Sequence, residues 1–280
     1  MKTPETPWLV APAIGLLLWT LSAYSLQSLA LVAASLVLAG VSFWSCRVLL
    51  GPRAAWMFLA TGATLGWLAE QAGSTLGWFF GHYTYTEVLG PRLGAVPLVI
   101  PLMWFGLTQI GFTLACLVLW RRPAPPADGW KPAALVALLG AMVVTAFDLG
   151  ADPYFVYQLK AWIMQMKDGG WFGETVRGFE GWMVVSFAIL AVFQATARPQ
   201  LAASPDARGR RAALAPILLY AAMIVFQMTQ VEPIALRVVA FFAMGIPALA
   251  AAVAWSQWAA TAVQPAPTAE PAAHGKELPQ

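Results

Sequence analysis

The sequence is poor in charged residues, in cysteine and in histidine. Only 10% of its 280 residues are charged, against about 25% in soluble globular proteins, and 60% are hydrophobic. The two cysteines, Cys46 and Cys116, lie in or beside apolar runs, which excludes a disulfide framework and a cysteine-based zinc motif. The two histidines, His82 and His274, stand far apart and offer no pair of metal ligands. These shortages exclude a soluble globular protein and indicate a polytopic membrane protein.

The sequence contains several long apolar runs. A helix needs roughly 20 apolar residues to cross a bilayer, and runs close to that length occur at 8–26, 28–46, 54–73, 96–120, 132–149, 179–197, 212–229 and 233–255. We therefore predict an all-α membrane bundle of about eight transmembrane helices, forming one integral membrane domain over residues 1–260. Residues 261–280 are polar and rich in proline and alanine, and we predict a disordered cytoplasmic tail.

The basic residues predict the orientation of this bundle. The N-terminus, the loops 47–53, 121–131 and 198–211 and the C-terminal tail together hold eleven of the 16 Lys and Arg residues. Cytoplasmic loops carry an excess of Lys and Arg, so both termini are expected in the cytoplasm, in a bacterial-type inner membrane. Because the basic residues are scattered over short loops and form no continuous face, the net charge of +3 does not indicate a nucleic-acid partner.

Acidic residues gather at the opposite, outer side of the predicted bundle. Glu70 lies in the third apolar run, where an ionisable group is costly and usually faces the bundle interior or a wet cavity. Such a carboxyl group suits a proton donor, although Glu70 could also reach water or pair with Arg92. Gly62 and Gly66, four residues apart, predict close packing of this helix against a neighbour.

Two more carboxyl groups end the fifth apolar run. Asp148 and Asp152 are four residues apart and therefore lie on one helical face. Neighbouring carboxylates repel each other, so one of the two tends to keep a proton, which places an acid and a base together. Asp152 before Pro153 could instead be the N-cap of a following helix, and an apolar stripe predicts that an interfacial helix covers 153–166.

Aromatic and glycine residues dominate the two long outer loops. Tyr83 and Tyr85 follow Gly77-Trp78-Phe79-Phe80-Gly81, and three prolines within eleven residues predict a bent entry to the fourth helix. A similar stretch, Gly169-Gly170-Trp171-Phe172-Gly173, precedes the sixth helix. The likeness predicts two re-entering loops over one cavity, while most of the rings could equally be interfacial anchors.

These motifs, taken in order, resemble the carotenoid biosynthesis membrane-protein family that includes carotenoid 1',2'-hydratases and bisanhydrobacterioruberin hydratase. The resemblance covers roughly residues 60–185. It rests on Glu70-x-x-Gly73, Phe80-Gly81-x-Tyr83-x-Tyr85, Leu89-Gly90-Pro91-x-Leu93, Val96-Pro97, Pro101-x-x-Trp104, Asp148-x-x-x-Asp152-Pro153, Gly170-x-Phe172-Gly173 and Phe179-x-Gly181-Trp182. The chain departs from the family pattern at Glu174-Thr175 and Gly178, where a Val/Ile-Pro pair and an Asn are usual.

The resemblance implies a hydratase that adds water to the terminal C1–C2 double bond of an acyclic carotenoid, with no metal or other cofactor. Asp148 would be the general acid, and Asp152 or Glu70 the base that activates water. The substrate-binding walls would be Trp67, Tyr83, Tyr85, Trp162, Phe172 and Trp182. The expected partners are a lipophilic carotenoid and the lipid bilayer, and the oligomeric state is left open.

Three other functions stay open at this point. A magnesium-dependent membrane prenyltransferase could use Asp-x-x-x-Asp to bind a diphosphate through the metal, but a second Asp-rich motif and basic phosphate ligands are missing. A proton-coupled carrier of a lipophilic solute could use Glu70 and Asp148 as a relay. The chain could also be a structural partner in a membrane complex.

Overall fold

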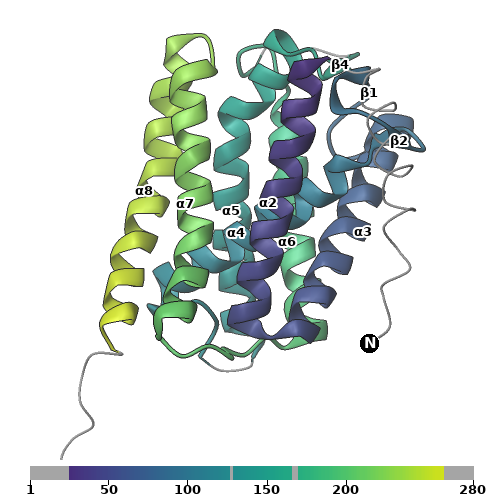
Figure 1. Ribbon diagram of the computed structural model, residues 1–280. Helices are drawn as coiled ribbons and strands as arrows, with labels where there is room; N and C mark the ends of the chain where they lie inside the picture. The colour runs from purple at the N-terminus through teal and green to yellow at the C-terminus, as the bar shows by residue number, and fades with distance from the viewer. Residues whose placement is uncertain (1–24, 127–128, 166–169, 262–280) are drawn as a thin grey trace, which may run out of the picture.

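The computed structural model describes residues 25–126, 129–165 and 170–261. Seven long helices in these ranges stand side by side, and short connections join them at both ends (Figure 1). They are α2 (Leu26–Leu50), α3 (Pro52–Leu76), α4 (Val99–Trp120), α5 (Trp130–Pro153), α6 (Val176–Ala197), α7 (Ala207–Gln230) and α8 (Ile234–Ala260). Seven of the eight predicted helices are therefore present, and nearly all of the first, 8–26, lies outside the described residues.

Within the described residues, six helices are long and apolar enough to cross a membrane: α2, α4, α5 with the turn that follows it, α6, α7 and α8. The chain is a multi-pass membrane protein. α3, which carries Arg53 and Glu70, does not reach that apolar content. The predicted tail also lies outside the described residues, apart from Thr261.

α4 is the centre of the bundle and packs against each of the other six described helices. Its side chains are buried without a break from Trp104 to Leu117, as expected for a helix that is apolar on all sides. Close approach of α4 to α5 depends on Gly111, because a Cβ atom there would lie 2.6 Å from the carbonyl oxygen of Gly140.

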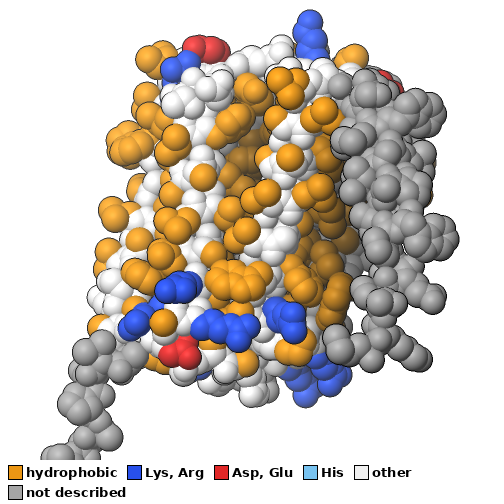
Figure 2. All heavy atoms as spheres, viewed as in Figure 1, with side chains coloured by type: hydrophobic (Ala, Val, Ile, Leu, Met, Phe, Trp, Pro, Cys, Tyr) orange, Lys and Arg blue, Asp and Glu red, His pale blue; other side chains and the backbone are white. Residues whose placement is uncertain are grey.

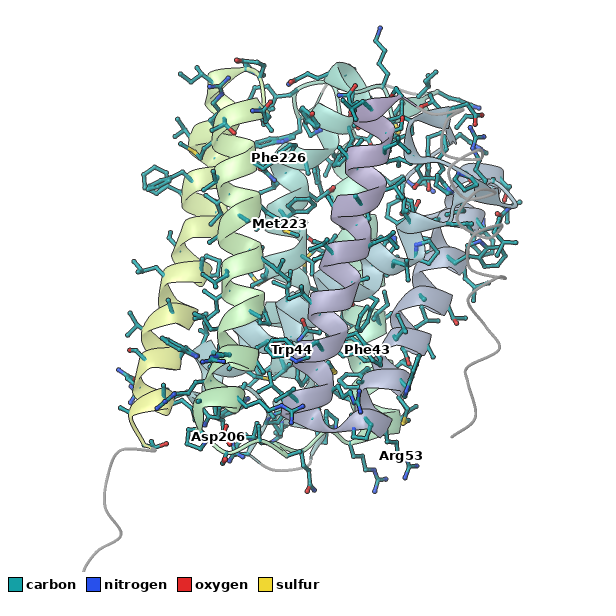
Figure 3. The ribbon with its side chains drawn as sticks, viewed as in Figure 1. Phe43, Trp44, Arg53, Asp206, Met223 and Phe226 are labelled. Atoms are coloured by element: carbon teal, nitrogen blue, oxygen red, sulfur yellow. The ribbon has the colours of Figure 1, made fainter. Side chains whose placement is uncertain are left out.

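The two ends of the bundle differ in structure and charge. One end, which we call the ribbon end, carries the short strands β1 (Tyr83–Tyr85), β2 (Arg92–Leu93), β3 (Val96–Pro97) and β4 (Trp162–Met164), and the 3-10 turn η1 (Glu87–Leu89). The other, the basic end, holds Arg53 and Asp206 (Figure 3). Figure 2 shows Lys and Arg side chains gathered toward that lower end, below an apolar surface.

The segment after α5 differs from the predicted interfacial helix. α5 continues through Pro153 into a π-helical turn, η2 (Tyr154–Gln158), where Tyr154 packs edge-on against Phe226 of α7. Lys160 then adopts a left-handed φ of 54°, and β4 pairs antiparallel with β1. The prediction of a helix over 153–166 therefore holds only as far as Gln158. Beyond it the prediction is wrong within the described residues, because pairing with a distant strand replaces local helical hydrogen bonds. The alternative role of Asp152 as an N-cap is wrong as well, since Asp152 lies in the last turn of α5.

The entry to α4 is irregular, as its prolines predict. β2 and β3 form a small antiparallel ribbon in which Arg92 lies opposite Pro97, and α4 begins two residues later, at Val99. The amide of Leu98 donates to the carbonyl of Pro91 at 2.8 Å, which folds this ribbon back over the start of α4.

Candidate active site at the ribbon end

A small cavity of about 50 Å³ lies at the ribbon end, enclosed by α3, α4, α5, α6 and the two strands β1 and β4. This volume has room for a few water molecules. Three carboxyl groups from different parts of the sequence line it, namely Glu70, Asp148 and Asp152. All three are buried, with 6%, 1% and 6% of their surface exposed. The structure thus brings together the three acidic residues singled out in the sequence.

Glu70 is held by three hydrogen-bond donors. The indole nitrogen of Trp104 donates to its Oε1 at 2.8 Å, and the hydroxyl of Tyr85 donates to its Oε2 at 2.8 Å. The hydroxyl of Tyr83 also donates to Oε2. Burial, together with the neighbouring Glu70 carboxyl, raises the pKa of both tyrosines well above its ordinary value, so both phenols keep the proton they donate. Both carboxyl oxygens of Glu70 therefore accept hydrogen bonds, and these bonds fix the position of its side chain.

Close packing of α3 against α4 places the donor of α4 next to Glu70 of α3. A Cβ atom on Gly62 would lie 2.9 Å from the Cα of Phe105, and one on Gly66 would lie 2.5 Å from Cγ of Trp104. The absence of side chains at these two positions lets the Trp104 indole reach across to Glu70. The close packing predicted from the Gly62 and Gly66 spacing is confirmed.

The two aspartates of α5 have different surroundings. Within the described residues, Oδ2 of Asp148 is buried and has no hydrogen-bond partner. Asp152 has Trp162 as a hydrogen-bond partner and Glu174 as an acidic neighbour. Its Oδ2 also faces the first turn of α6, since a Cβ atom on Gly178 would lie 3.9 Å from it. The positive end of the α6 dipole favours negative charge there. Asp148 is therefore the lining carboxyl group with a buried oxygen that has no hydrogen-bond partner within the described residues, whereas Asp152 has such a partner and lies near the first turn of α6.

Aromatic rings form most of the remaining wall. Trp182 stacks on Trp104 with ring centroids 4.4 Å apart, and Trp162 stacks on Phe155 at 5.2 Å. Phe80 adds a further ring. Electron-rich ring faces stabilise a nearby cation, by about 2 kcal/mol or more when water is excluded. The cavity thus combines proton-carrying groups with surfaces suited to a positively charged intermediate.

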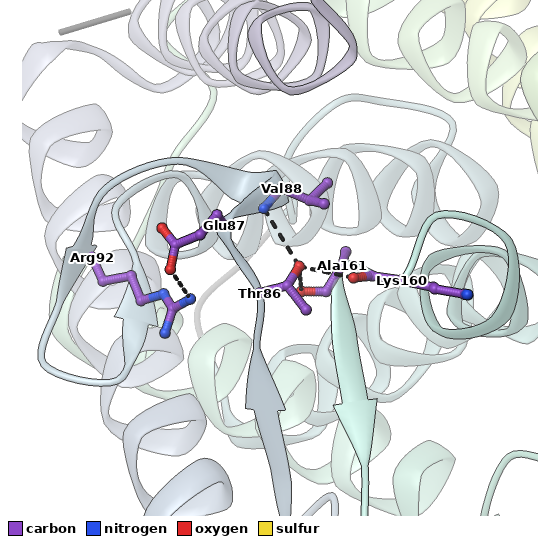
Figure 4. A network of polar contacts seen from close by, with 6 residues as sticks. All are labelled: Thr86, Glu87, Val88, Arg92, Lys160 and Ala161. Carbon is purple, nitrogen blue, oxygen red and sulfur yellow. Dashed lines mark hydrogen bonds and ion pairs between the residues drawn. The ribbon is translucent and has the colours of Figure 1, made fainter. Parts of the chain in front are cut away.

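A short β-ribbon covers the cavity. Tyr83 and Tyr85 on β1 lie opposite Met164 and Trp162 on β4, and all four line the cavity. The hydroxyl of Thr86 lies 2.8 Å from the carbonyl of Lys160 and 3.1 Å from that of Ala161, and Arg92 pairs with Glu87 at 2.9 Å beside it (Figure 4). Arg92, which the sequence offered as a possible partner of Glu70, pairs with Glu87 instead.

Two predicted wall residues lie away from the cavity. The indole of Trp67 donates to the carbonyl of Leu93 at 3.2 Å, and Phe172 is 40% exposed in a turn with a φ of 48°. Tyr83, Tyr85, Trp162 and Trp182 do line it. The sequence reasoning missed Trp104, Phe80 and Phe155 as wall residues. Trp104 and Phe80 stand in the motifs that carry the family resemblance, which was a usable signal.

Replacing Trp104 with Phe should remove one donor from Glu70 while keeping an aromatic ring. A buried acceptor that loses its partner costs about 1–3 kcal/mol, so the free energy of unfolding in detergent should fall by that amount. Trp182→Phe is the matched control, because it shortens the ring stacked on Trp104 and leaves the donors of Glu70 in place. Equal stability of the two variants would contradict the anchoring role of the indole nitrogen.

The fold and the cavity define a class: a multi-pass α-helical membrane protein with a buried, aromatic-walled acidic pocket at one end of its bundle. Among the described residues, no three His, Cys, Asp or Glu side chains are arranged to hold a metal ion. The chain belongs to the carotenoid biosynthesis protein family, whose model matches residues 24–262. No curated protein and no solved structure matches it.

Proposed function

We propose that this protein is a cofactor-independent carotenoid hydratase of a bacterial-type inner membrane. Its reaction adds water across the terminal C1–C2 double bond of an acyclic carotenoid end group. The observation that carries the proposal is that Asp148 lines an aromatic cavity with room for water and has a buried Oδ2 with no hydrogen-bond partner within the described residues, in a member of a carotenoid biosynthesis family.

In the proposed mechanism, Asp148 enters as the neutral acid. Burying a neutral carboxyl group costs far less free energy than burying an unpaired carboxylate. The Asp148 oxygen that has no hydrogen-bond partner within the described residues would present the proton to a bound alkene. Protonation at C2 leaves a tertiary cation at C1. The stacked Trp104 and Trp182 and the carboxyl group of Glu70 lie on the walls around it, where they would stabilise the positive charge.

Asp152 completes the reaction as the base. Water attacks C1, and one of its protons passes to Asp152, whose negative form is supported by the first turn of α6. Glu70 is the weaker candidate for this role, because three donors already occupy its oxygens. The sum is one alkene and one water converted to a tertiary alcohol, with no net uptake of protons.

We further propose that the ribbon end faces away from the cytoplasm. The positive-inside rule supports this orientation, because Arg53, Arg121 and Arg198 lie at the opposite end, together with further arginines of α7. The substrate would enter from the bilayer. A cavity of about 50 Å³ holds water but not an isoprenoid tip, so the aromatic walls or the ribbon must move apart to admit it.

Expression in a host that makes lycopene or γ-carotene tests this function. Pigments heavier by one water are the expected product, and they should form equally well when magnesium is chelated in isolated membranes. An added prenyl unit and magnesium dependence would instead support a prenyltransferase. Unchanged pigment would overturn the hydratase and favour a carrier. Asp148→Asn in the same host is the control for activity supplied by the host itself.

A further inference from the structure

A second, larger pocket lies between α5 and α6 at the basic end, opposite the acidic cavity. Its volume is about 600 Å³. The start of α5 lines it with Trp130 and Ala133, and the last turns of α6 line it with Ala191, Gln194 and Arg198. None of its lining residues also lines the acidic cavity, so the pocket is a separate site.

Gln194 fixes the wall of this pocket and leaves an acceptor in it. Its Nε2 donates to the carbonyl of Ala133 on α5 at 2.9 Å and to that of Leu190 at 3.1 Å, which holds the two helices at a set distance. Gln194 is only 6% exposed, and its Oε1 is buried without a hydrogen-bond partner within the described residues. Buried polar atoms normally have a partner, and a ligand hydroxyl that reached this wall would supply one.

The charged end of the pocket is positive. Arg198 is exposed, and the two ion pairs found within the described ranges both lie at the ribbon end, so neither involves Arg198. Lys131 lies 5.7 Å from the centre of the Trp130 ring, and the lining residues include no Asp or Glu. α5 begins at this pocket with no described side chain capping its first turn, and the positive end of a helix dipole favours an anion. These charges select a negatively charged ligand.

The apolar part of the pocket has the depth of one leaflet of the bilayer. Phe187 lies eleven residues before Arg198 on α6, which is about 16 Å at the 1.5 Å rise of a helix. The apolar core of a bilayer is about 30 Å thick, so this depth is about half of it. Phe187 and Ala195 are exposed on a helix long and apolar enough to span the membrane, so the pocket borders the lipid. A small water-soluble anion would fill only the charged end, whereas a phospholipid would fill both parts.

We propose that this pocket binds one anionic glycerophospholipid. Its phosphate would lie at Arg198 and the first turn of α5, and one acyl chain would run along Ala191 and Phe187. Basic pockets between membrane-spanning helices suit anionic head groups, and the glycerol hydroxyls of phosphatidylglycerol would provide the donor that Gln194 lacks. The inference does not rest on the proposed function, because the pocket would hold a lipid whether or not the acidic cavity hydrates a carotenoid.

Native mass spectrometry of the purified full chain, titrated in detergent with phosphatidylglycerol, tests the proposal. The wild type should bind one lipid, and Arg198→Gln should weaken that binding about fivefold, the contribution of one basic residue near a membrane surface. Arg53→Gln is the matched control, because Arg53 is exposed at the same end and does not line the pocket. Asp148→Asn should bind the lipid like the wild type. Equal losses in Arg198→Gln and Arg53→Gln would show only a general attraction to basic residues and overturn the proposal.

A steric variant tests the apolar part and serves if Arg198→Gln cannot be purified. Ala195→Trp should fill the pocket and abolish binding, whereas Thr196→Trp, at the exposed neighbouring residue that does not line it, should bind normally. Phosphatidylcholine with the same chains should bind about fivefold more weakly than phosphatidylglycerol, and equal binding would refute selection by charge. Glycerol 3-phosphate at the same concentration should not displace the lipid. Displacement would show a site for soluble phosphate esters and refute the lipid site.

Discussion

Hydration should be abolished when Asp148 is replaced by Asn, while the protein still inserts into the membrane. Asn has nearly the shape of Asp but no proton to deliver to the alkene. Loss of a general acid lowers rates by about 10²- to 10⁴-fold, and Asp148 is the lining carboxyl group with an oxygen that has no partner among the described residues. Pigment conversion per unit of membrane-inserted protein is the measurement.

Thr145→Val is the matched control for Asp148→Asn. Thr145 lies on the same helix, is 8% exposed, and its hydroxyl has no hydrogen-bond partner within the described residues. It does not line the acidic cavity. Val has almost the same shape, so this variant should convert pigment at the wild-type rate. Near-normal turnover by Asp148→Asn would show that another group delivers the proton.

The sequence was sufficient to predict the membrane class and most of the helices. Apolar runs predicted α2 to α8 because in lipid only a helix satisfies its own backbone hydrogen bonds over such a length. Glu70 and Asp148 also stood out in the sequence, because an ionisable group in a membrane-spanning segment is costly and usually has a functional role. These two residues converge with Asp152 on one cavity because all three lie toward the ribbon end of their helices.

The chain between the helices could not be predicted in the same way. The apolar stripe after Pro153 fits a helix, yet its residues Trp162 and Ile163 belong to a strand, and Ile163 is 58% exposed. The pairing of β4 with β1 joins segments about eighty residues apart. The spacing of apolar residues within one segment cannot reveal such a distant partner. Trp104 was missed for a related reason. Within an apolar helix, an indole that donates to a carboxyl group looks the same in sequence as one that only fills space.

Adding a single carbon at Gly66 should lower the stability of the protein. A Cβ atom there would lie 2.5 Å from Cγ of Trp104 and 2.6 Å from its Cβ. Since Trp104 is 1% exposed and stacked on Trp182, its ring has little room to turn. Gly66→Ala must therefore push α3 away from α4 or break the Trp104–Glu70 hydrogen bond. Overpacking of this kind costs about 1–3 kcal/mol, which should appear as a lower unfolding temperature in detergent.

Gly40→Ala separates this steric effect from the general effect of replacing glycine. Gly40 lies inside α2, and a Cβ atom there would have nothing within 4 Å. In a helix interior, Ala is more favourable than Gly by about 1 kcal/mol, so Gly40→Ala should be at least as stable as the wild type. If Gly66→Ala were equally stable, the close approach of α3 and α4 would not be what holds the indole against Glu70. Because the same contact orders the cavity wall, Gly66→Ala should also lose hydration activity in the fraction that stays folded, whereas Gly40→Ala should keep it.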